Sequence, residues 1–197
     1  MTTIRLVEEK DSAGILNIYA PYVLETAVTF ELEVPSLEVF WERAKKNLAE
    51  APFLVCEIDG QIAGYAYASR HRSRGAYQWT RELSVYVHPH FRKRKIATAL
   101  YLTIIQLLKL QNFRNALAGI TMPNRASILL HEHLGFELVG TYNNIGYKLG
   151  KSHQVSWWER TLIPSSIPMV PIKTMQEVVE TAEWQEQLKS GIRLIRD

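Results

Sequence analysis

Apolar and polar positions in the first seventy residues predict a mixture of strands and helices. Residues 3–7 (TIRLV) suit a strand, and Asp11 is expected to cap an amphipathic helix through LNIYAPYVL. Residues 27–33 (AVTFELE) suit a short extended segment, and Ser36 is expected to cap a second helix, LEVFWERAKKNLAEA. The β-rich runs FLVCEIDG and QIAGYAYASR meet at Asp59-Gly60, which indicates a hairpin.

A strand and a long helix follow. Residues 81–88 (RELSVYVH) predict a strand that leads through a basic joint into a helix from about Ile96 to Leu110. One stripe of this helix is apolar, so we expect it to pack against the sheet. The stripe contains Ile96, Leu100, Ile104, Leu107 and Leu108.

The remaining elements complete the expected sheet. Residues 116–122 (ALAGITM) predict a strand, Pro123-Asn124 begins a helix that Gly135 is expected to end, and FELVGTY and HQVSWWERTL are the last strand candidates. Hairpins come early in this order, and strand-helix units come late. The fold class is therefore expected to be α/β of the α+β type, with a mixed, largely antiparallel central sheet and helices on both faces.

The character of the chain changes after Leu162. The segment IPSSIPMVPIK has three prolines in eleven residues, which excludes a regular helix or a central strand. We therefore divide the chain into a main domain, residues 1–163, and an extension, residues 164–197, made of a Pro-rich linker and a terminal helix. Trp184 suggests that the extension packs across a neighbouring subunit; the alternative is a solvated helix.

Composition excludes several classes of protein. The net charge is only +3, so the molecule is not a polycation that coats nucleic acid, and any anion site must be local. The only cysteine, Cys56, lies in an apolar run and indicates a reducing compartment. Residues 96–108, the most membrane-like stretch, fall short of the roughly 20 residues that a span needs. A cytoplasmic protein without membrane or nucleic-acid partners is expected.

Four consecutive cations, Arg92 to Lys95, stand where the strand of residues 81–88 meets the long helix. A helix N-terminus offers unpaired backbone N–H groups and a favourable dipole to an anion, so this joint is a candidate phosphate site. The alternative is a solvated basic loop. The joint lacks the glycines that usually let a backbone approach a phosphate closely.

The motifs VYVHPHFRKRKIATAL and PNRASILLHEHLGFELVG resemble the acetyl-CoA-binding motifs of the GNAT acetyltransferase superfamily. A narrower resemblance, to the phosphinothricin and methionine-sulfoximine acetyltransferases, is carried by AYQWTRELSVYVHP, ETAVTFE, LHEHLGF and GYKLGKSHQVSWWERTL. It covers about residue 3 to residue 163, which would make the main domain an acetyltransferase domain. In the superfamily the joint usually reads Gln/Arg-x-x-Gly-x-Gly/Ala, and Lys95 stands where the glycine is expected.

This resemblance implies acetyl-CoA as co-substrate. Arg92 to Lys95 would bind its pyrophosphate, and a splayed strand near Val85 would offer a backbone N–H to the oxyanion. The residues expected to bind acetyl-CoA are Val85, Tyr86, Val87, Arg92, Lys93, Arg94, Lys95, Ile96, Ala97, Asn124 and Ser127. No metal is expected, because His88-Pro-His90 and His131-Glu-His133 lack the spacing of metal-ligand pairs.

Two residues are expected to carry catalysis. Transfer of an acetyl group to an amine needs a proton acceptor, and Glu82 matches the acidic position of the resembling family. The alternative is a surface carboxylate paired with Arg81. His131 would protonate the leaving thiolate or bind the substrate; the alternative is a histidine that caps a helix or fills a gap.

The acceptor site is expected to hold an acidic or polar amino-acid analogue. Arg72 and Arg74 lie two apart and project to one side of an extended segment, where paired guanidinium groups suit a carboxylate or phosphinate. By resemblance the acceptor-binding residues are Phe30, Arg72, Arg74, Tyr77 and Glu82.

The sequence therefore predicts direct acetyl transfer, in a homodimeric enzyme, to the α-amine of a compound such as phosphinothricin, methionine sulfoximine or methionine sulfone. Another small amine or a peptide N-terminus is the first alternative acceptor. A non-catalytic acyl-CoA sensor is the second alternative, and it is suggested by Lys95 in place of the expected glycine.

Overall fold

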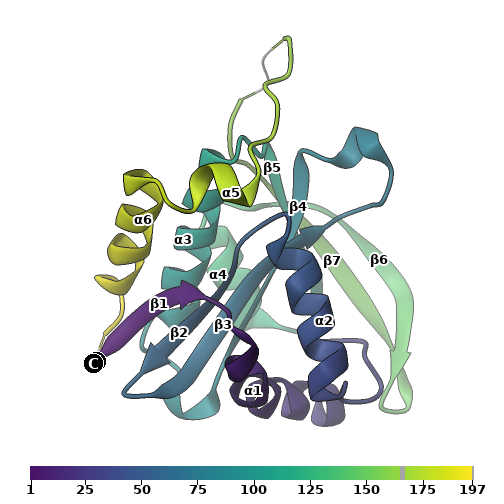
Figure 1. The fold of residues 1–197 in the computed structure, drawn as a ribbon. Coiled ribbons are helices and arrows are strands. Elements are labelled where there is room, and N and C mark those ends of the chain that lie inside the picture. Colours follow the sequence, from purple (N-terminus) through teal and green to yellow (C-terminus); the bar gives the residue numbers. More distant parts are fainter. Residues whose placement is uncertain (165–166, 197) are drawn as a thin grey trace.

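A computed structural model describes residues 1–164 and 167–196, which form one sheet covered by helices on both faces (Figure 1). The strands are β1 (Thr2–Leu6), β2 (Phe53–Ile58), β3 (Gln61–Arg70), β4 (Thr80–Val87), β5 (Asn115–Thr121), β6 (Glu137–Lys148) and β7 (Lys151–Thr161). The helices are α1 (Ser12–Glu25), α2 (Leu37–Leu48), α3 (Ile96–Leu110), α4 (Arg125–His133), α5 (Met175–Val178) and α6 (Ala182–Ile192), with 3-10 turns η1 (Glu9–Asp11), η2 (Gly75–Tyr77) and η3 (Pro89–Phe91).

The sheet has the order β1-β2-β3-β4-β5-β7-β6, and only the β4–β5 pair is parallel. This confirms the predicted mixed, largely antiparallel sheet. The β2–β3 hairpin turns at Asp59 and Gly60, whose φ angles of 50° and 81° are those that a tight hairpin turn requires. The pairing of β4 with β5 extends from Thr80 only as far as Glu82, which lies opposite Leu117. The two strands then separate.

Helices α1 and α2 cover one face of the sheet, and α3, α4 and α6 cover the other (Figure 1). The predicted helix Ile96–Leu110 is confirmed, and every residue of its predicted apolar stripe is at most 1% exposed. Ser36 caps α2 by accepting a hydrogen bond from Val39 N. Gly135 ends α4 with φ 72°, and its N–H donates to Glu132 O while Phe136 N–H donates to His131 O.

Two local predictions are wrong. Residues 27–33 bend at 27–29 and 32–33 instead of forming one extended segment, and the Thr26 and Thr29 hydroxyls accept hydrogen bonds there from Val28 N and Glu31 N. The Asp11 carboxylate makes no cap bond to α1.

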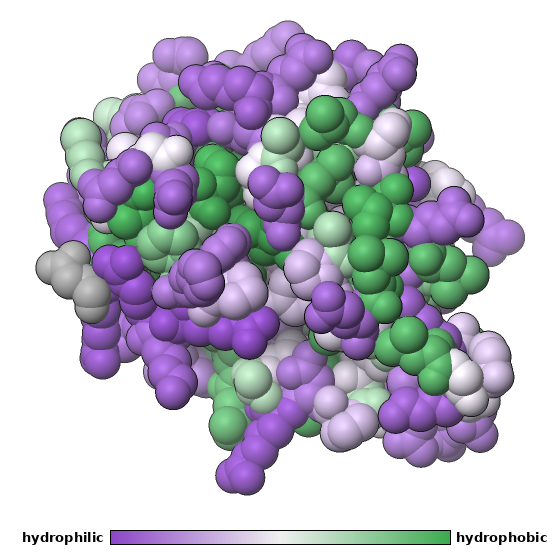
Figure 2. All heavy atoms as spheres, turned by 90° about the horizontal axis from the view of Figure 1, so that it is seen from below, coloured by the Kyte–Doolittle hydropathy of each residue, from purple (hydrophilic) through white to green (hydrophobic). Residues whose placement is uncertain are grey.

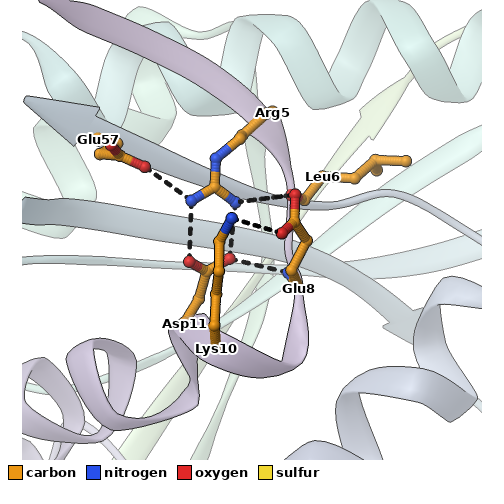
Figure 3. Close-up of polar contacts among 6 residues, drawn as sticks. All are labelled: Arg5, Leu6, Glu8, Lys10, Asp11 and Glu57. Atoms are coloured by element: carbon orange, nitrogen blue, oxygen red, sulfur yellow. Dashed lines mark hydrogen bonds and ion pairs between the residues drawn. The ribbon is translucent and has the colours of Figure 1, made fainter. Parts of the chain in front are cut away.

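Asp11 instead belongs to a polar cluster around Arg5 (Figure 3). The Arg5 guanidinium donates to both Asp11 oxygens, at 2.7 and 2.8 Å, and to Glu57 at 2.7 Å. Burial alone would raise the pKa of Asp11, but the bonds from Arg5 and from Glu8 N hold it below its ordinary value. The cluster therefore ties β1, β2 and the start of α1 together.

The extension after Leu162 packs on its own chain. Instead of one terminal helix it forms α5 and α6, and the Thr181 hydroxyl caps α6 by accepting from Trp184 N. Trp184 is fully buried in the core that α3 shares with β1. The alternative of a solvated helix is therefore wrong, and the packing of the extension across a neighbouring subunit stays a prediction. Residues 165 and 166 of the predicted linker lie outside the described residues.

The outermost strand, β6, exposes large apolar side chains to solvent. Figure 2 shows apolar side chains gathered on the side of the molecule where β6 lies in Figure 1. Each of the following, from β6 and the turn after it, is more than half exposed: Leu138, Val139, Tyr142, Ile145, Tyr147 and Leu149. By contrast Cys56, on β2, is fully buried, and burial raises the pKa of its thiol to about 12.

Candidate functional site

Two cavities lie along the gap between β4 and β5. The smaller, of about 70 Å³, lies between the separated strands and is lined by Leu83, Tyr86, Gly119 and His131, among others. The larger is a groove of about 720 Å³ beside the start of α3. Asn124, Ser127, Val28 and Val85 line both cavities, so α4 and β4 link them.

The groove combines a cationic end with an apolar wall. Arg92, Lys93 and Lys95 line it together with Ile96 and Ala97 at the N-terminus of α3. The first helical hydrogen bond runs from Ala99 N to Lys95 O, so the N–H groups that precede it are free of the helix and available to an anion. Val85, Val87 and Leu130 provide the apolar wall. This arrangement suits an elongated ligand with a phosphate at one end.

The loop of residues 88–95, here called the anion loop, takes its shape without glycine. Lys93 and Lys95 have φ angles of 66° and 61°, in the left-handed region that favours glycine. Such a conformation costs a lysine roughly 1–2 kcal/mol. Lys95 therefore reproduces the backbone that the expected glycine would supply, and its ammonium group is added to the groove.

Arg94 lies apart from the other three cations of the anion loop. Its Nε donates to Arg196 O at 2.8 Å, and its own carbonyl oxygen accepts from Arg196 N at 3.0 Å. Its guanidinium carbon lies 5.7 Å from the centre of the Phe91 ring. Arg94 was expected to bind acetyl-CoA, but the structure places its side chain on the segment that follows α6, while Arg92, Lys93 and Lys95 line the groove.

The three residues of β4 that were expected to bind acetyl-CoA, Val85, Tyr86 and Val87, point to different faces of the sheet. Val85 and Val87 line the groove. Tyr86 points to the opposite face, where its ring makes edge contacts with Tyr19 and Tyr22, with centroids 5.1 and 5.2 Å apart. The Tyr22 hydroxyl also donates to Val87 O at 3.2 Å. Tyr86 therefore supports the strand from behind and contacts only the smaller cavity.

Helix α4 brings Asn124, Ser127 and His131 to the cavities. The Asn124 side chain caps the helix by accepting from Ser127 N at 3.2 Å. His131 Nδ1 lies 2.7 Å from Ser127 O, and because a carbonyl can only accept, Nδ1 carries the proton. His131 is 3% exposed and packs against the rings of Tyr101 and Phe136.

His131 therefore carries its proton on Nδ1, and it is one of the residues that line the smaller cavity. Burial lowers its pKa, which favours the uncharged ring. Its Nε2 is buried, and none of the residues that the structure describes gives it a hydrogen-bond partner. In this state Nε2 can accept a hydrogen bond and cannot donate a proton. The neutral ring suits the binding of a hydrogen-bond donor, and both predicted roles of His131, protonation of the thiolate and binding of the substrate, stay predictions.

Glu82 lies at the other end of β4, in a chain of hydrogen bonds with the β3–β4 loop. Glu82 Oε1 is 2.5 Å from His71 Nδ1, and Arg72 Nε donates to His71 Nε2 at 3.2 Å. Since Arg72 can only donate, His71 Nε2 is the acceptor and Nδ1–H donates to Glu82. The chain Arg72–His71–Glu82 therefore joins a predicted acceptor-binding arginine to the predicted proton acceptor.

Aromatic rings surround His71 in this chain. Its ring makes edge contacts with Tyr77 and Trp157, with centroids 5.9 and 5.8 Å apart. The Arg72 guanidinium lies 5.7 Å from the centre of the Tyr77 ring. Arg74 is exposed on the same loop, at the start of η2. The structure thus brings Arg72, Tyr77 and Glu82 together, as the sequence predicted.

The alternative role of Glu82, as the partner of Arg81, is wrong. Alternate residues of a strand point to opposite faces, and Arg81 is buried on the face that α3 covers. There its guanidinium donates to Glu50 at 2.9 Å and lies 4.6 Å from the centre of the Phe113 ring. Glu82 is therefore free of Arg81, and about 30% of its side chain is accessible to solvent.

Phe30 lies apart from the other predicted acceptor-binding residues. Its ring contacts His153, and a Cβ at Gly146 would collide with it. His153 is four residues along β7 from Trp157, which corresponds to about 13 Å of strand. Within the described residues of one chain, Phe30 therefore packs against the β6–β7 hairpin and not against the Arg72 loop.

Two residues of the site, His71 and Trp157, were missed by the sequence analysis. His71 stands between two arginines in RHRSR, and the sequence analysis assigned a role in this run to Arg72 and Arg74 but none to His71. The hairpin register that sets Ser69 opposite Glu82 brings His71 to the carboxylate. The predicted hairpin at Asp59-Gly60 pairs β2 with β3, so it does not reveal this register.

Neither a metal cluster nor a membrane span is found in the part of the chain that the structure describes. Residues 1–164 and 167–196 contain no group of three His, Cys, Asp or Glu side chains placed to share a metal ion. Over the same ranges, no helix combines the length and the apolar character needed to cross a bilayer.

Comparisons with known proteins agree with this geometry. The model of the acetyltransferase (GNAT) domain family matches residues 4–157. The chain is 31% identical over 176 residues to phosphinothricin N-acetyltransferase of Streptomyces viridochromogenes, covering 89% of this chain and 95% of the relative. It is 31% identical over 168 residues to the L-methionine sulfoximine/L-methionine sulfone acetyltransferase of Salmonella typhimurium, covering 84% and 98%.

A solved structure supports the same assignment. The GNAT superfamily phosphinothricin acetyltransferase of Sinorhizobium meliloti, in complex with acetyl-CoA, matches with a TM-score of 0.78 at 31% identity. The match covers 86% of this chain and 96% of that one. Fold, family model and relatives thus confirm the resemblance found in the sequence. The chain belongs to the GNAT superfamily and is an N-acetyltransferase.

Proposed function

We propose that this enzyme transfers an acetyl group from acetyl-CoA directly to the α-amine of a small amino-acid analogue with an anionic or polar head, such as phosphinothricin, methionine sulfoximine or methionine sulfone. The observation that carries the proposal is the hydrogen-bonded chain Arg72–His71–Glu82. It places an arginine suited to an anionic acceptor next to a carboxylate suited to an amine. Relatives named for these acceptors add support.

The groove has the features needed to hold acetyl-CoA. Arg92, Lys93, Lys95 and the free N–H groups at the start of α3 would bind the pyrophosphate, and Val85 and Val87 would contact the pantetheine. The backbone edge of β4 beyond Glu82 has separated from β5, so its N–H groups can stabilise negative charge on the acetyl oxygen. Acetyl-CoA supplies the activated thioester.

Glu82 would take the proton that the amine releases. An ammonium group must lose a proton before its nitrogen can attack, and a partly exposed carboxylate can pass that proton to solvent. The bond from His71 fixes the orientation of the carboxylate. His131, which lines the smaller cavity, would accept a hydrogen bond at Nε2 from an N–H or O–H group of acetyl-CoA.

Arg72 and Arg74 would set the preference for the acceptor. A guanidinium group binds a carboxylate, phosphinate or sulfoximine oxygen through paired N–H donors, and it repels a polyamine. A non-catalytic sensor would need neither these arginines nor Glu82. The observation that suggested a sensor, Lys95 in place of a glycine, also carries less weight, because Lys95 adopts the backbone conformation that favours glycine.

A thiol-release assay with acetyl-CoA tests the proposal. The acceptors are phosphinothricin, methionine sulfoximine, methionine sulfone, ordinary amino acids and a polyamine. We expect turnover confined to the first three, and a raised KM for them in the folded double variant Arg72→Ala/Arg74→Ala. Unchanged kinetics in that variant would refute the acceptor assignment. Cofactor binding without turnover on any amine would favour the sensor.

We also propose that the enzyme is a cytoplasmic homodimer. The exposed apolar residues of β6, an edge strand, support self-association, because unpaired apolar edges rarely stay open to solvent. Sedimentation should then show a dimer that Tyr147→Asp weakens. A monomer at all concentrations would refute this proposal.

A further inference from the structure

The segment that follows α6, residues 193–196, ends against the anion loop. Arg196 N donates to Arg94 O at 3.0 Å, and Arg94 Nε donates to Arg196 O at 2.8 Å. The two residues are about a hundred positions apart in the sequence, so nothing local brings them together. We call residues 193–196 the C-terminal brace.

The C-terminal brace is firmly anchored at its other end. Helix α6 approaches α3 so closely that a Cβ at Gly191 would collide with Thr103 Oγ1. Trp184 is fully buried, and Ile192 and Ile195 pack against the same core. The position of Arg196 is therefore fixed relative to α3, the helix whose N-terminus forms the anion site.

The point of attachment lies between the two unfavourable residues of the anion loop. Lys93 and Lys95, on either side of Arg94, both have left-handed backbone conformations. A lysine leaves this region readily unless its neighbours restrain it. The bonds to Arg94 restrain the residue between them, while Arg92, Lys93 and Lys95 line the groove. The brace thus substitutes for the conformational preference that glycine would provide.

We propose that the C-terminal brace positions the anion loop, so that the loop is in its ligand-binding conformation before coenzyme A binds. Arg196 is a positioning residue, since it acts through Arg94 and not on the ligand. The proposal rests on the proposed use of acetyl-CoA. It predicts that removing the brace weakens coenzyme A binding in proportion to the fraction of molecules whose loop leaves that conformation.

The test compares two substitutions at one position of the full chain. Arg196→Pro removes the N–H that donates to Arg94 O, whereas Arg196→Ala keeps both backbone groups. Binding of coenzyme A itself is measured by calorimetry. We expect Kd to rise about fivefold in Arg196→Pro relative to Arg196→Ala, as when only a fifth of the molecules are competent. Equal Kd values in the two variants would overturn the proposal.

A second pair of variants tests whether the C-terminal brace acts by holding Lys95 in its left-handed conformation. Glycine takes the left-handed conformation without penalty, so in a Lys95→Gly background the ratio of the two Kd values should fall below about twofold. An undiminished ratio would overturn the proposed link to the loop conformation. A merely structural role would lower the melting temperature without changing this ratio.

Hydrogen exchange separates failure of the inference from failure of the proposed function. Without ligand, the amides of residues 93–97 should exchange faster in Arg196→Pro than in Arg196→Ala. Wild-type protein that fails to bind coenzyme A would refute the proposed function, and the exchange rates would still decide on the brace. Equal exchange rates at residues 93–97 in the two variants would overturn the proposed role of the C-terminal brace.

Discussion

The two ends of β4 are built in different ways. At the end that pairs with β5, Glu82 depends on side chains, because His71 and Arg72 orient it through hydrogen bonds. At the end that has left β5, the anion loop depends on backbone shape and on several cations at once. Loss of one side chain should therefore have a large effect at the first end and a small effect at the second.

The largest expected effect is that of Glu82→Gln. The amide keeps the size of the side chain but cannot take a proton, so kcat should fall about 10²- to 10⁴-fold. Coenzyme A binding should stay unchanged, since the groove lies at the other end of the strand. Steady-state kinetics and calorimetry measure the two quantities. Glu57→Gln, in the polar cluster around Arg5, is the matched control, and a kcat loss of similar size there would remove the distinction.

His71→Phe should have the next largest effect. The ring would still fill the space between Tyr77 and Trp157, but the hydrogen bond to Glu82 would be lost. Bonds to charged groups contribute about 1.5–3 kcal/mol, so kcat/KM should fall at least about tenfold. His71→Gln, which retains a donor, should recover part of the activity; no difference between the two variants would contradict this role.

Arg92→Ala tests the other end of β4. Three cations and the N-terminus of α3 lie together at this end. Loss of one of them should therefore raise the Kd for coenzyme A only about two- to fivefold, as expected for one exposed charge at a helix terminus. The increase should shrink at high salt. Lys109→Ala, at the far end of α3, is the control. A hundredfold loss in Arg92→Ala would show that one side chain dominates, and the contrast between the two ends would fail.

The last effect concerns stability and should leave activity at neutral pH unchanged. The folded-state pKa of His131 lies below its ordinary value of about 6.5 because the ring is buried. Below pH 6.5 the unfolded chain therefore binds more protons, and the free energy of unfolding should fall by at most about 1.4 kcal/mol per pH unit until the folded pKa is reached. Urea unfolding at pH 7.5 and 5.5 measures this loss, which should be smaller in His131→Asn. An equal loss in both proteins would refute the assignment.

The sequence predicted the parts of this molecule that local pattern determines. The apolar stripe of α3 and the glycine that ends α4 each depend on residues within a few turns of one another. The same is true of the cations at the start of α3. The sequence could not show left-handed lysines at 93 and 95, because the propensity of lysine disfavours that conformation.

Contacts between distant segments account for the other misses. His71 meets Glu82 through the register of β3 and β4, which the hairpin alone does not reveal. Trp184 suggested a contact with a neighbouring subunit because Glu183 and Glu186 flank it in the sequence, yet its side chain is buried in the core of its own chain beside α3. The position of Phe30 likewise depends on the β6–β7 hairpin, more than a hundred residues away.

The burial of Cys56 has a practical consequence for measurements on this enzyme. It is the only cysteine in the sequence, it is fully buried, and its pKa is about 12. Thiol reagents attack thiolates, so the folded protein should contribute almost no background to a colorimetric assay of released coenzyme A. Slow labelling at one equivalent per chain would instead report unfolding. A single reagent can therefore follow both turnover and loss of the fold in one cuvette.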